Sequence, residues 1–185
     1  MRFRDRVDAG RQLAARLGQL APAEQAADTL IAVGMPRGGV PVAAEVARAL
    51  GIPLDVVIVR KLGVPSHPEL AMGAIGEDEV RFLDDETVAA LRVSPEQIAM
   101  VERVERTELE RRANTYRQGA PRISLNGKTA MVIDDGIATG ATARVACRVV
   151  RAHGAHRVVL AVRIAPLGWE ALLDGEADEF VTLAE

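Results

Sequence analysis

The hydrophobic pattern alternates between short apolar runs and longer stretches in which apolar residues recur with helical spacing. The apolar runs are rich in β-branched residues, which favours buried strands. Five segments fit this description, namely 29–34, 54–59, 129–133, 157–164 and 178–185. The last of them predicts a short edge strand.

Amphipathic stretches between the apolar runs predict helices at 5–20, 40–50, 94–117 and 143–153. The third helix has a defined start, since Ser94 is a candidate N-cap, Pro95 takes the first position and Gln97 completes a capping box. Strands that alternate with helices predict a parallel sheet with right-handed crossovers. The expected fold is therefore α/β, with a mainly parallel five-stranded sheet flanked by helices.

The segment 60–84 interrupts this alternation. It contains several glycines, two prolines and no clear period. Its pattern predicts a hairpin around 76–79, bounded by turn residues. We interpret the whole segment as a mobile flap.

Composition restricts the classes of protein to consider. The 185 residues are 49% hydrophobic, which suits a single domain spanning 1–185 with a sizeable core. A formal net charge of -3 disfavours a nucleic acid or anionic lipid partner. No apolar run approaches the roughly 18 residues of a membrane span, and "MRFRDRVDAGRQLAARL" lacks an apolar export signal, so a cytoplasmic location is expected. Cys147, the one cysteine, lies in an apolar helix pattern and predicts a buried thiol.

The loop "MPRGG", which follows the first predicted strand, has the chemistry of an anion site. Gly38 and Gly39 allow a ligand to approach the backbone closely at the start of a helix. Arg37 adds a planar guanidinium with several donors. A phosphate or diphosphate suits such a loop.

The loop "ATGAT", which follows the third predicted strand, is a second anion site. Thr139 and Thr142 add hydroxyl groups to the backbone donors of 138–141 at another helix start. If the first and third strands are neighbours, both loops open onto one crevice at the carboxyl edge of the sheet. A ligand with phosphate at both ends would bridge them.

Two adjacent carboxylates, Asp134 and Asp135, stand between these loops in "VIDDGIATGAT". Direct contact with phosphate would be repulsive, but carboxylates accept hydrogen bonds from vicinal hydroxyl groups such as those of a ribose. The same pair favours a divalent cation nearby, which would screen the phosphates.

These motifs resemble those of the type I phosphoribosyltransferases. "VIDDGIATGAT" is similar to the family's signature for 5-phosphoribosyl-1-pyrophosphate (PRPP), "PRGG" to its pyrophosphate loop, and "VRK" to the start of its catalytic flap. "MPRGGVPVAAEVA", "VRKLGVPSHPELAMGAI" and "DDGIATGAT" together resemble a bacterial group of stand-alone phosphoribosyltransferases whose acceptor is unassigned. The resemblance extends over 3–185 and implies a homodimer, Mg2+ dependence and a reduced C-terminal hood over the base.

The resemblance also implies a role for each matching residue. Asp134 and Asp135 would hold the ribose hydroxyl groups and act indirectly on a Mg2+ ion held mainly by PRPP. Arg60 and Lys61 would close over the diphosphate as catalytic flap residues. The remaining PRPP-binding residues would be Arg37, Gly38, Gly39, Gly136, Ile137, Ala138, Thr139, Gly140, Ala141 and Thr142.

Ala138 departs from the pattern of the members that act on 6-oxopurines, which carry an acidic residue there. Adenine-type members resemble this chain in having alanine. A 6-oxopurine acceptor is therefore disfavoured, although adenine does not follow.

Four side chains outside the anion loops are further candidates. Lys61 is one of only two lysines among 23 basic residues, which favours a specific role over a solvated one. His67 and Glu69, in the flap, are candidate acid, base or metal-ligand groups, against the alternative of solvated loop residues. Trp169 is either a base-stacking residue or part of the core.

The sequence thus predicts a Mg2+-dependent phosphoribosyltransferase that moves the 5-phosphoribosyl group of PRPP to a nitrogenous small molecule, a nucleobase in particular. The alternative is a non-catalytic regulator that senses PRPP or a nucleotide with the same fold. A plain nucleotide-binding module is disfavoured, because neither "GxxxxGK[ST]" nor "GxGxxG" occurs.

Overall fold

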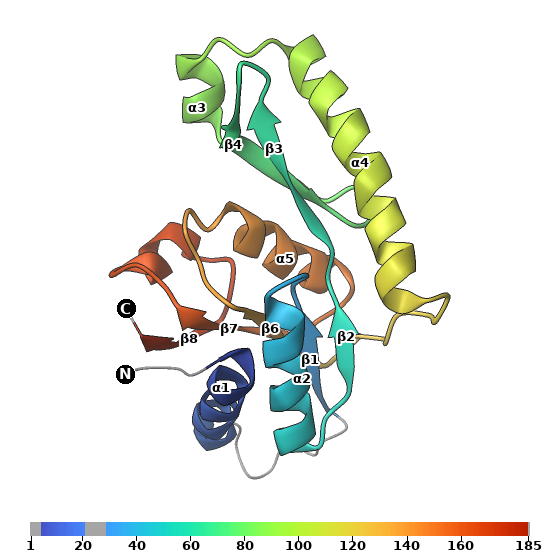
Figure 1. Ribbon diagram of the computed structural model, residues 1–185, viewed down its shortest axis with the longest axis vertical. Helices are drawn as coiled ribbons and strands as arrows, with labels where there is room; N and C mark the ends of the chain where they lie inside the picture. The colour runs from blue at the N-terminus through green and yellow to red at the C-terminus, as the bar shows by residue number, and fades with distance from the viewer. Residues whose placement is uncertain (1–4, 21–28, 185) are drawn as a thin grey trace.

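A parallel sheet of five strands forms the centre of the molecule, in the order β2-β1-β6-β7-β8 (Figure 1). The computed structural model describes residues 5–20 and 29–184. The strands are β1 (Leu30–Gly34), β2 (Leu54–Val56), β6 (Thr129–Asp134), β7 (Arg157–Ile164) and β8 (Glu179–Ala184). All neighbouring strands in this sheet are parallel, which confirms the predicted α/β fold. The final residue of the predicted fifth strand, Glu185, lies outside the described residues.

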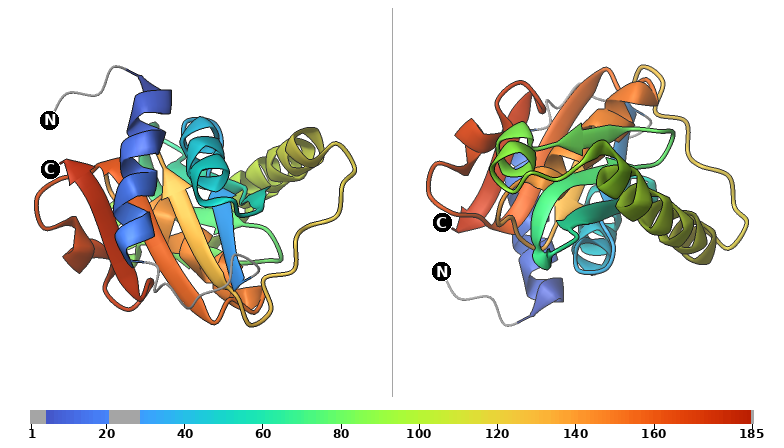
Figure 2. Two further views of the ribbon diagram at one scale, coloured as in Figure 1. Left: turned by 90° about the horizontal axis from the view of Figure 1, so that it is seen from below. Right: turned by 90° about the horizontal axis from the view of Figure 1, so that it is seen from above.

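Helices cover both faces of this sheet (Figure 2). The helices α1 (Arg6–Leu20) and α2 (Gly39–Leu50) pack on one face, against side chains that include Ala32 and Ile133. The helix α5 (Ala141–Ala152) packs on the other face, against residues that include Val33 and Val132. Side chains that alternate in this way explain the nearly continuous apolar runs of β1, β6 and β7, because both faces of these strands are buried.

The predicted strand 54–59 is wrong as a single element. The strand β2 ends at Val56, and β3 (Val59–Val64) begins a second sheet. At the crossing, the N–H of Val57 donates to the carbonyl of Gly34 (3.1 Å) and that of Ile58 donates to a carboxylate oxygen of Glu77 (3.2 Å). An apolar run cannot reveal such a change of partner, because both of its ends are strand and the residues between them, Val57 and Ile58, are buried.

The segment predicted to be a loose flap is mostly an antiparallel sheet of β3, β4 (His67–Gly76) and β5 (Arg81–Leu83). The predicted hairpin around 76–79 is confirmed as the turn between β4 and β5. A second hairpin, between β3 and β4, was hidden by the prolines and glycines and by register shifts after Leu62. The short helix α3 (Asp85–Ala90) follows β5.

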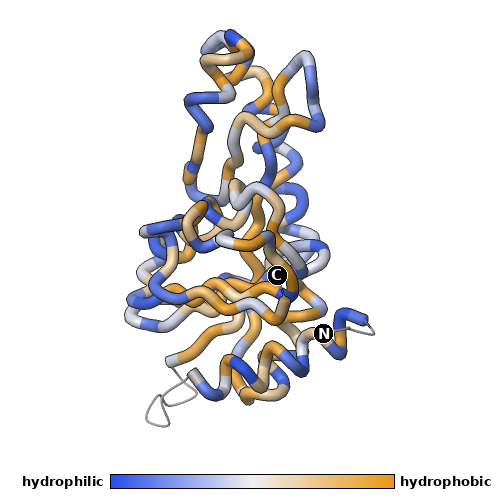
Figure 3. The backbone as a smooth tube through the Cα atoms, turned by 90° about the vertical axis from the view of Figure 1, so that its left-hand side faces the viewer, coloured by the Kyte–Doolittle hydropathy of each residue, from blue (hydrophilic) through white to orange (hydrophobic). Residues whose placement is uncertain are grey.

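The two sheets are stacked with α5 between them (Figure 1). The antiparallel sheet lies so close to α5 that a Cβ atom on Gly76 would be 2.4 Å from a methyl carbon of Val149. The long helix α4 (Pro95–Arg117) covers the opposite face of the antiparallel sheet, packing Ile98 and Leu109 against it. Figure 3 shows the resulting layers, with the most hydrophobic segments in the parallel sheet.

The predicted capping box and core thiol agree with the structure, while the helix predicted at 143–153 begins two residues earlier, at Ala141. The capping box of α4 is present: the N–H of Gln97 donates to Ser94 Oγ (3.3 Å), and Gln97 Oε1 accepts from the N–H of Ser94 (2.9 Å). Cys147 is fully buried, and burial raises the pKa of its thiol to about 12. Within the described ranges, no helix has the length and apolar character needed to cross a membrane.

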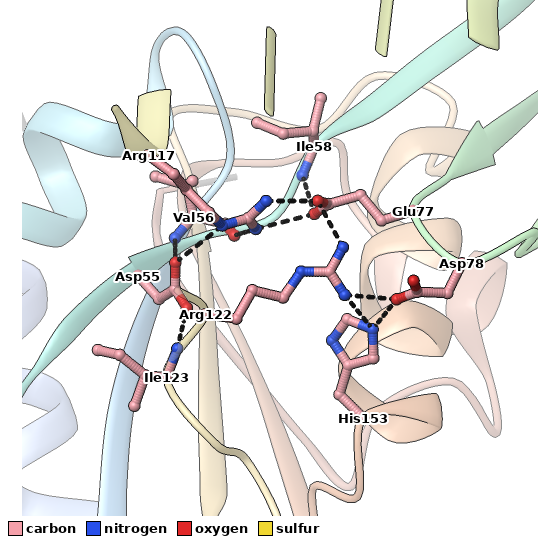
Figure 4. A network of polar contacts seen from close by, with 9 residues as sticks. All are labelled: Asp55, Val56, Ile58, Glu77, Asp78, Arg117, Arg122, Ile123 and His153. Atoms are coloured by element: carbon pink, nitrogen blue, oxygen red, sulfur yellow. Dashed lines mark hydrogen bonds and ion pairs between the residues drawn. The ribbon is translucent and has the colours of Figure 1, made fainter. Parts of the chain in front are cut away.

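A buried ion-pair network joins the two sheets, centred on Glu77 at the end of β4 (Figure 4). Glu77 is 4% exposed. Its carboxylate accepts from Arg117 Nη1 and Nη2 (2.5 and 3.0 Å) and from Arg122 Nη2 (2.8 Å). Burial raises the pKa of Glu77, but the two guanidinium groups outweigh it, so the net direction is downward. The carboxylate is therefore charged at neutral pH.

The same network extends to β2 and to α5. Arg117 Nη2 also donates to the carbonyl of Val56 (2.8 Å), at the end of β2. Asp78 pairs with Arg122 (2.5 Å) and with the ring of His153, which ends α5. The network thus holds the antiparallel sheet in place relative to the parallel sheet, by connecting the end of β4 to the ends of β2 and α5.

We expect Arg117→Ala to lower the free energy of unfolding by about 3 kcal/mol. This is the low end of the range for breaking a buried ion pair, because Arg122 still pairs with Glu77. Urea denaturation measures the change. The control is Arg111→Ala on the same helix, since Arg111 is 64% exposed and pairs with Glu108 of its own helix, where a loss below about 0.5 kcal/mol is expected. Equal losses in the two variants would contradict the role of the network.

Candidate functional site

The two predicted anion loops lie side by side, because β1 and β6 are neighbours in the sheet. The N–H of Met35, just after β1, donates to the carbonyl of Ile133 in β6 (2.9 Å). A Cβ atom on Gly38 would lie 2.1 Å from Oδ2 of Asp135, and one on Gly39 would lie 2.3 Å from the carbonyl oxygen of Ile133. Position 39 therefore requires glycine, because the obstacle is backbone, whereas a side chain at position 38 would displace the carboxylate of Asp135. The glycine loop touches the acidic pair directly.

The loop after β6 ends at the N-terminus of α5. Gly140 precedes the helix with φ +78°, a conformation that glycine adopts readily. The first helical hydrogen bond is donated by Arg144 N–H to the carbonyl of Gly140 (2.8 Å), so the N–H groups before it have no acceptor within the helix. Ala138 and Thr139 are exposed at this end. The arrangement suits a phosphate group bound by backbone donors and the positive end of the helix dipole.

The acidic pair lies at the carboxyl end of β6, between the two loops. The N–H of Asp135 donates to Asp134 Oδ1 (2.8 Å). Burial raises the pKa of Asp134 to about 7, and the charge of Asp135 adds to this effect, while the N–H of Asp135 and the charge of Lys61 oppose it. Asp134 is thus a half-buried carboxyl group that a ligand with hydroxyl groups or a nearby cation would stabilise in its ionised form.

Arg6, at the start of α1, reaches the same site and was not predicted. Its Nε and Nη2 donate to Asp135 Oδ2 at 3.2 and 3.0 Å. The two residues are 129 positions apart in the chain. Nothing in the periodicity of α1 distinguishes Arg6 from the other exposed arginines of that helix, so the contact could not be foreseen.

Lys61 and Arg60, predicted together as flap residues, point to opposite sides of β3. Arg60 donates to Glu105 of α4 at 2.7 Å and is held against that helix, so the structure does not bring it to the acidic pair. Side chains alternate along a strand, so Lys61 faces α5, and it shares a cavity with Thr139 and Ala141 at the start of that helix. The motif "VRK" names adjacent residues and carries no information about which one faces the ligand.

A cavity of about 290 Å3 separates the antiparallel sheet from the N-terminus of α5. Its wall includes Lys61, Glu69, Phe82, Asp84, Thr139 and Arg144. Glu69 thus shares a cavity with the flap lysine and the phosphate loop. His67 does not line it, and its Nδ1 lies 3.0 Å from Ser66 Oγ at the hairpin turn. Of the two flap candidates, only Glu69 is placed to meet a bound ligand.

Trp169 belongs to the core, which corrects the base-stacking hypothesis. It lies in the 3-10 helix η2 (Trp169–Leu173), is 0% exposed, and meets Phe180 edge to face with ring centroids 5.4 Å apart. Neither face of its ring is available to a base. The exposed apolar side chain beside the acidic pair is instead that of Ile164, which is 46% exposed and lies near Gly136.

A divalent cation fits this site only with help from the ligand. Within residues 5–20 and 29–184, no cluster of three or more histidine, cysteine or acidic side chains could hold a metal ion. Mg2+ is commonly bound through one or two carboxylates together with substrate phosphates and water. Asp134 and Asp135 lie next to a loop that suits a diphosphate, so the site matches this combination of carboxylates and substrate phosphates.

Comparison with known proteins gives a consistent result. The family model described as "Phosphoribosyl transferase domain" matches residues 4–170. Two proteins of Mycobacterium tuberculosis, each named "Putative phosphoribosyl transferase", are 56% identical over 182 residues. That alignment covers 98% of this chain and 40% of theirs, so the chain spans about two fifths of the length of these relatives.

Solved structures agree in fold. A crystal structure of a protein from Thermus thermophilus has 41% identity and a TM-score of 0.78, covering all of this chain and 85% of that one. The purine phosphoribosyltransferase of Pyrococcus horikoshii has 20% identity and a TM-score of 0.52, with 97% of this chain and 83% of that one covered. The second likeness concerns the fold alone.

The raised pKa of Asp134 predicts a pH-dependent effect of Asp134→Asn on stability. The ordinary pKa is 3.8 and that of the folded protein is about 7, so the wild type loses stability as pH rises between these values, whereas asparagine does not. We expect the variant's free energy of unfolding, relative to wild type, to increase from pH 4 to pH 7 and then to level off. Urea denaturation across this range, with the exposed Asp174→Asn as control, measures it. A difference independent of pH would refute the assignment.

Proposed function

The chain belongs to the phosphoribosyl transferase family, and on that premise we propose that it transfers the 5-phosphoribosyl group of PRPP to a nitrogenous small molecule with release of pyrophosphate. The observation that carries the proposal is the contact between the Gly38–Gly39 loop and the acidic pair, with the α5 N-terminus at the other end of the pair. These three features match a ligand with a diphosphate, a vicinal diol and a terminal phosphate in that order.

Each part of PRPP has a partner of suitable chemistry. The 5-phosphate binds the backbone donors of 138–142 at the start of α5. The ribose hydroxyl groups donate to Asp134 and Asp135. The diphosphate lies on Gly38 and Gly39, with the Arg37 side chain exposed beside it.

Lys61 approaches the leaving diphosphate from the antiparallel sheet. The acceptor nitrogen attacks C1 as the bond to the diphosphate oxygen breaks, so positive charge develops on the sugar and negative charge on the leaving group. Lys61 faces the acidic pair from β3 and stabilises the negative charge on the leaving diphosphate. Catalysis comes mainly from positioning and from this electrostatic effect.

Mg2+ is the cation that we propose for this site. Asp134 and Asp135 would hold it indirectly, through the bound diphosphate and water, and it would neutralise charge on the leaving group.

The acceptor that we propose is a nucleobase other than a 6-oxopurine. Ala138 is exposed at the loop and presents only a methyl group, so the loop offers no carboxylate to a purine N7. Proton removal, where an acceptor needs it, falls to Glu69, which lines the cavity shared with Lys61. The exposed side of Ile164 offers an aliphatic surface for the ring, in place of the buried Trp169.

The direct test is incubation of the protein with PRPP, Mg2+ and a panel of nucleobases and amines, with pyrophosphate release as the readout. Pyrophosphate released only with one class of acceptor supports the proposal and names that class. PRPP binding without turnover across the panel would instead support a PRPP-sensing regulator. Absence of PRPP binding would refute both.

We expect Lys61→Ala to reduce turnover by about 100-fold while PRPP affinity changes by less than about tenfold, because Lys61 acts on charge that develops in the transition state. The matched control is Arg60→Ala on the neighbouring position of β3. Arg60 pairs with Glu105 on the far side of the strand, so its loss should leave both quantities within about threefold. Steady-state kinetics and calorimetry measure the two effects. A larger loss of turnover in Arg60→Ala would reverse this assignment.

Hypoxanthine and guanine should be poor acceptors, because Ala138 cannot accept a hydrogen bond from the purine. Each should react at least about tenfold more slowly than the best acceptor of the panel, which corresponds to one lost hydrogen bond of about 1.4 kcal/mol. Competition assays with equal concentrations measure the ratio. Equal rates would show that the residue at this position does not select the base.

A further inference from the structure

The N-terminal helix contributes a cation to a site otherwise built from strand-to-helix loops. We infer that Arg6 is a further ligand-binding residue, which holds Asp135 with one edge of its guanidinium and binds the diphosphate of the ligand with the rest. The inference rests on the proposed function in taking that diphosphate to be part of PRPP.

The position of Arg6 is set by the packing of α1. Leu13 and Leu17 of this helix are buried against the sheet, at 0% and 1% exposure. The helix also lies so close to α2 that a Cβ atom on Gly10 would be 2.6 Å from the Cβ of Glu45. A helix anchored in this way directs its first residue toward the carboxyl edge of the sheet. The packing of α1 therefore sets where Arg6 lies, and its guanidinium meets Asp135 there.

Arg6 and the glycine loop meet at the same carboxylate oxygen. Oδ2 of Asp135 accepts from Arg6 Nε and Nη2, and it is the atom that a Cβ on Gly38 would approach to 2.1 Å. A diphosphate held by the backbone of Gly38 and Gly39 would consequently lie close to the charge of Asp135. Such neighbours repel unless a cation lies at the same place, and Arg6 is at that place.

The guanidinium of Arg6 has donors to spare. Asp135 uses Nε and one N–H of Nη2, and no other residue in the ranges 5–20 and 29–184 accepts from the Nη1 group or from the second N–H of Nη2. The side chain is 56% exposed, so these donors are accessible to a ligand. Arginine suits the role because its fork binds a carboxylate and a phosphate oxygen at once, and it stays charged.

The test is calorimetric binding of PRPP, ribose 5-phosphate and inorganic pyrophosphate to wild type, Arg6→Ala and Arg6→Lys. In Arg6→Ala we expect affinity for PRPP and for pyrophosphate to fall about tenfold or more. Affinity for ribose 5-phosphate, which has the diol and no diphosphate, should change by less than about threefold. Lysine, which retains the charge and loses the fork, should recover part of the affinity. The control is Arg11→Ala on the same helix, since Arg11 is 72% exposed and pairs with Glu45, away from Asp135.

Three results would overturn the inference. They are unchanged affinity for pyrophosphate in Arg6→Ala, tighter binding in that variant, and an equal loss for ribose 5-phosphate, which would mean that Arg6 acts only by orienting Asp135. If the wild type binds pyrophosphate but does not bind PRPP, the proposed function is refuted. The change in pyrophosphate affinity between wild type and Arg6→Ala then remains the test of Arg6. Wild-type binding of neither would overturn both.

Discussion

The site depends on the direct contact between β1 and β6 at the centre of the parallel sheet. From this pair the chain proceeds outward in both directions, to β2 through α2 and to β7 through α5. The loops after β1 and β6 therefore open at the same edge, and each leads into a helix. The glycines of the first loop let its backbone touch the carboxylates that follow β6. With a larger residue at position 39, the two loops would be forced apart and the ligand groups that we assign to them would no longer match their spacing.

The parallel sheet provides the anion loops and the acidic pair, and the layers above α5 provide Lys61 and Glu69. The two parts are joined by the network around Glu77, which is far from the acidic pair in sequence and contributes nothing to it directly. Its guanidinium groups hold the end of β2, the end of β4 and the end of α5 together. In the proposed reaction, the position of Lys61 and Glu69 relative to the anion loops thus depends on this network. Its buried charges lie at the end of the antiparallel sheet opposite the hairpin turn that carries His67.

The features that followed from local pattern could be predicted from the sequence. The five strands of the parallel sheet, the capping box at Ser94 and the buried Cys147 each depend on residues close together in the chain. So does the chemistry of the two anion loops, although their adjacency needed the strand order as well.

Features decided by tertiary contacts could not be predicted. Arg60 and Lys61 are equally basic, and only the packing of β3 between α4 and α5 separates their directions. Trp169 was ambiguous because a sole tryptophan suits a core as well as a ligand site, and its contact with Phe180 decides for the core. Arg6 was missed because its partner is 129 residues away. The split of the run 54–59 depended on a hydrogen bond from Ile58 to Glu77, which no local pattern contains.

The path of the chain through the upper layers has an evolutionary consequence. The antiparallel sheet, α3 and α4 form one continuous excursion from the parallel sheet, leaving after β2 and returning before β6. The outgoing segment after β2 and the returning segment after α4 both pass through the joint formed by Arg117, Arg122 and Glu77. An excursion whose two ends meet at one joint, and which otherwise packs on α5, can be exchanged or reshaped as a unit while the sheet and its anion loops stay intact. Leaving-group stabilisation, which the proposed function assigns to Lys61 of the excursion, can then diverge among relatives independently of how the sugar phosphate is held.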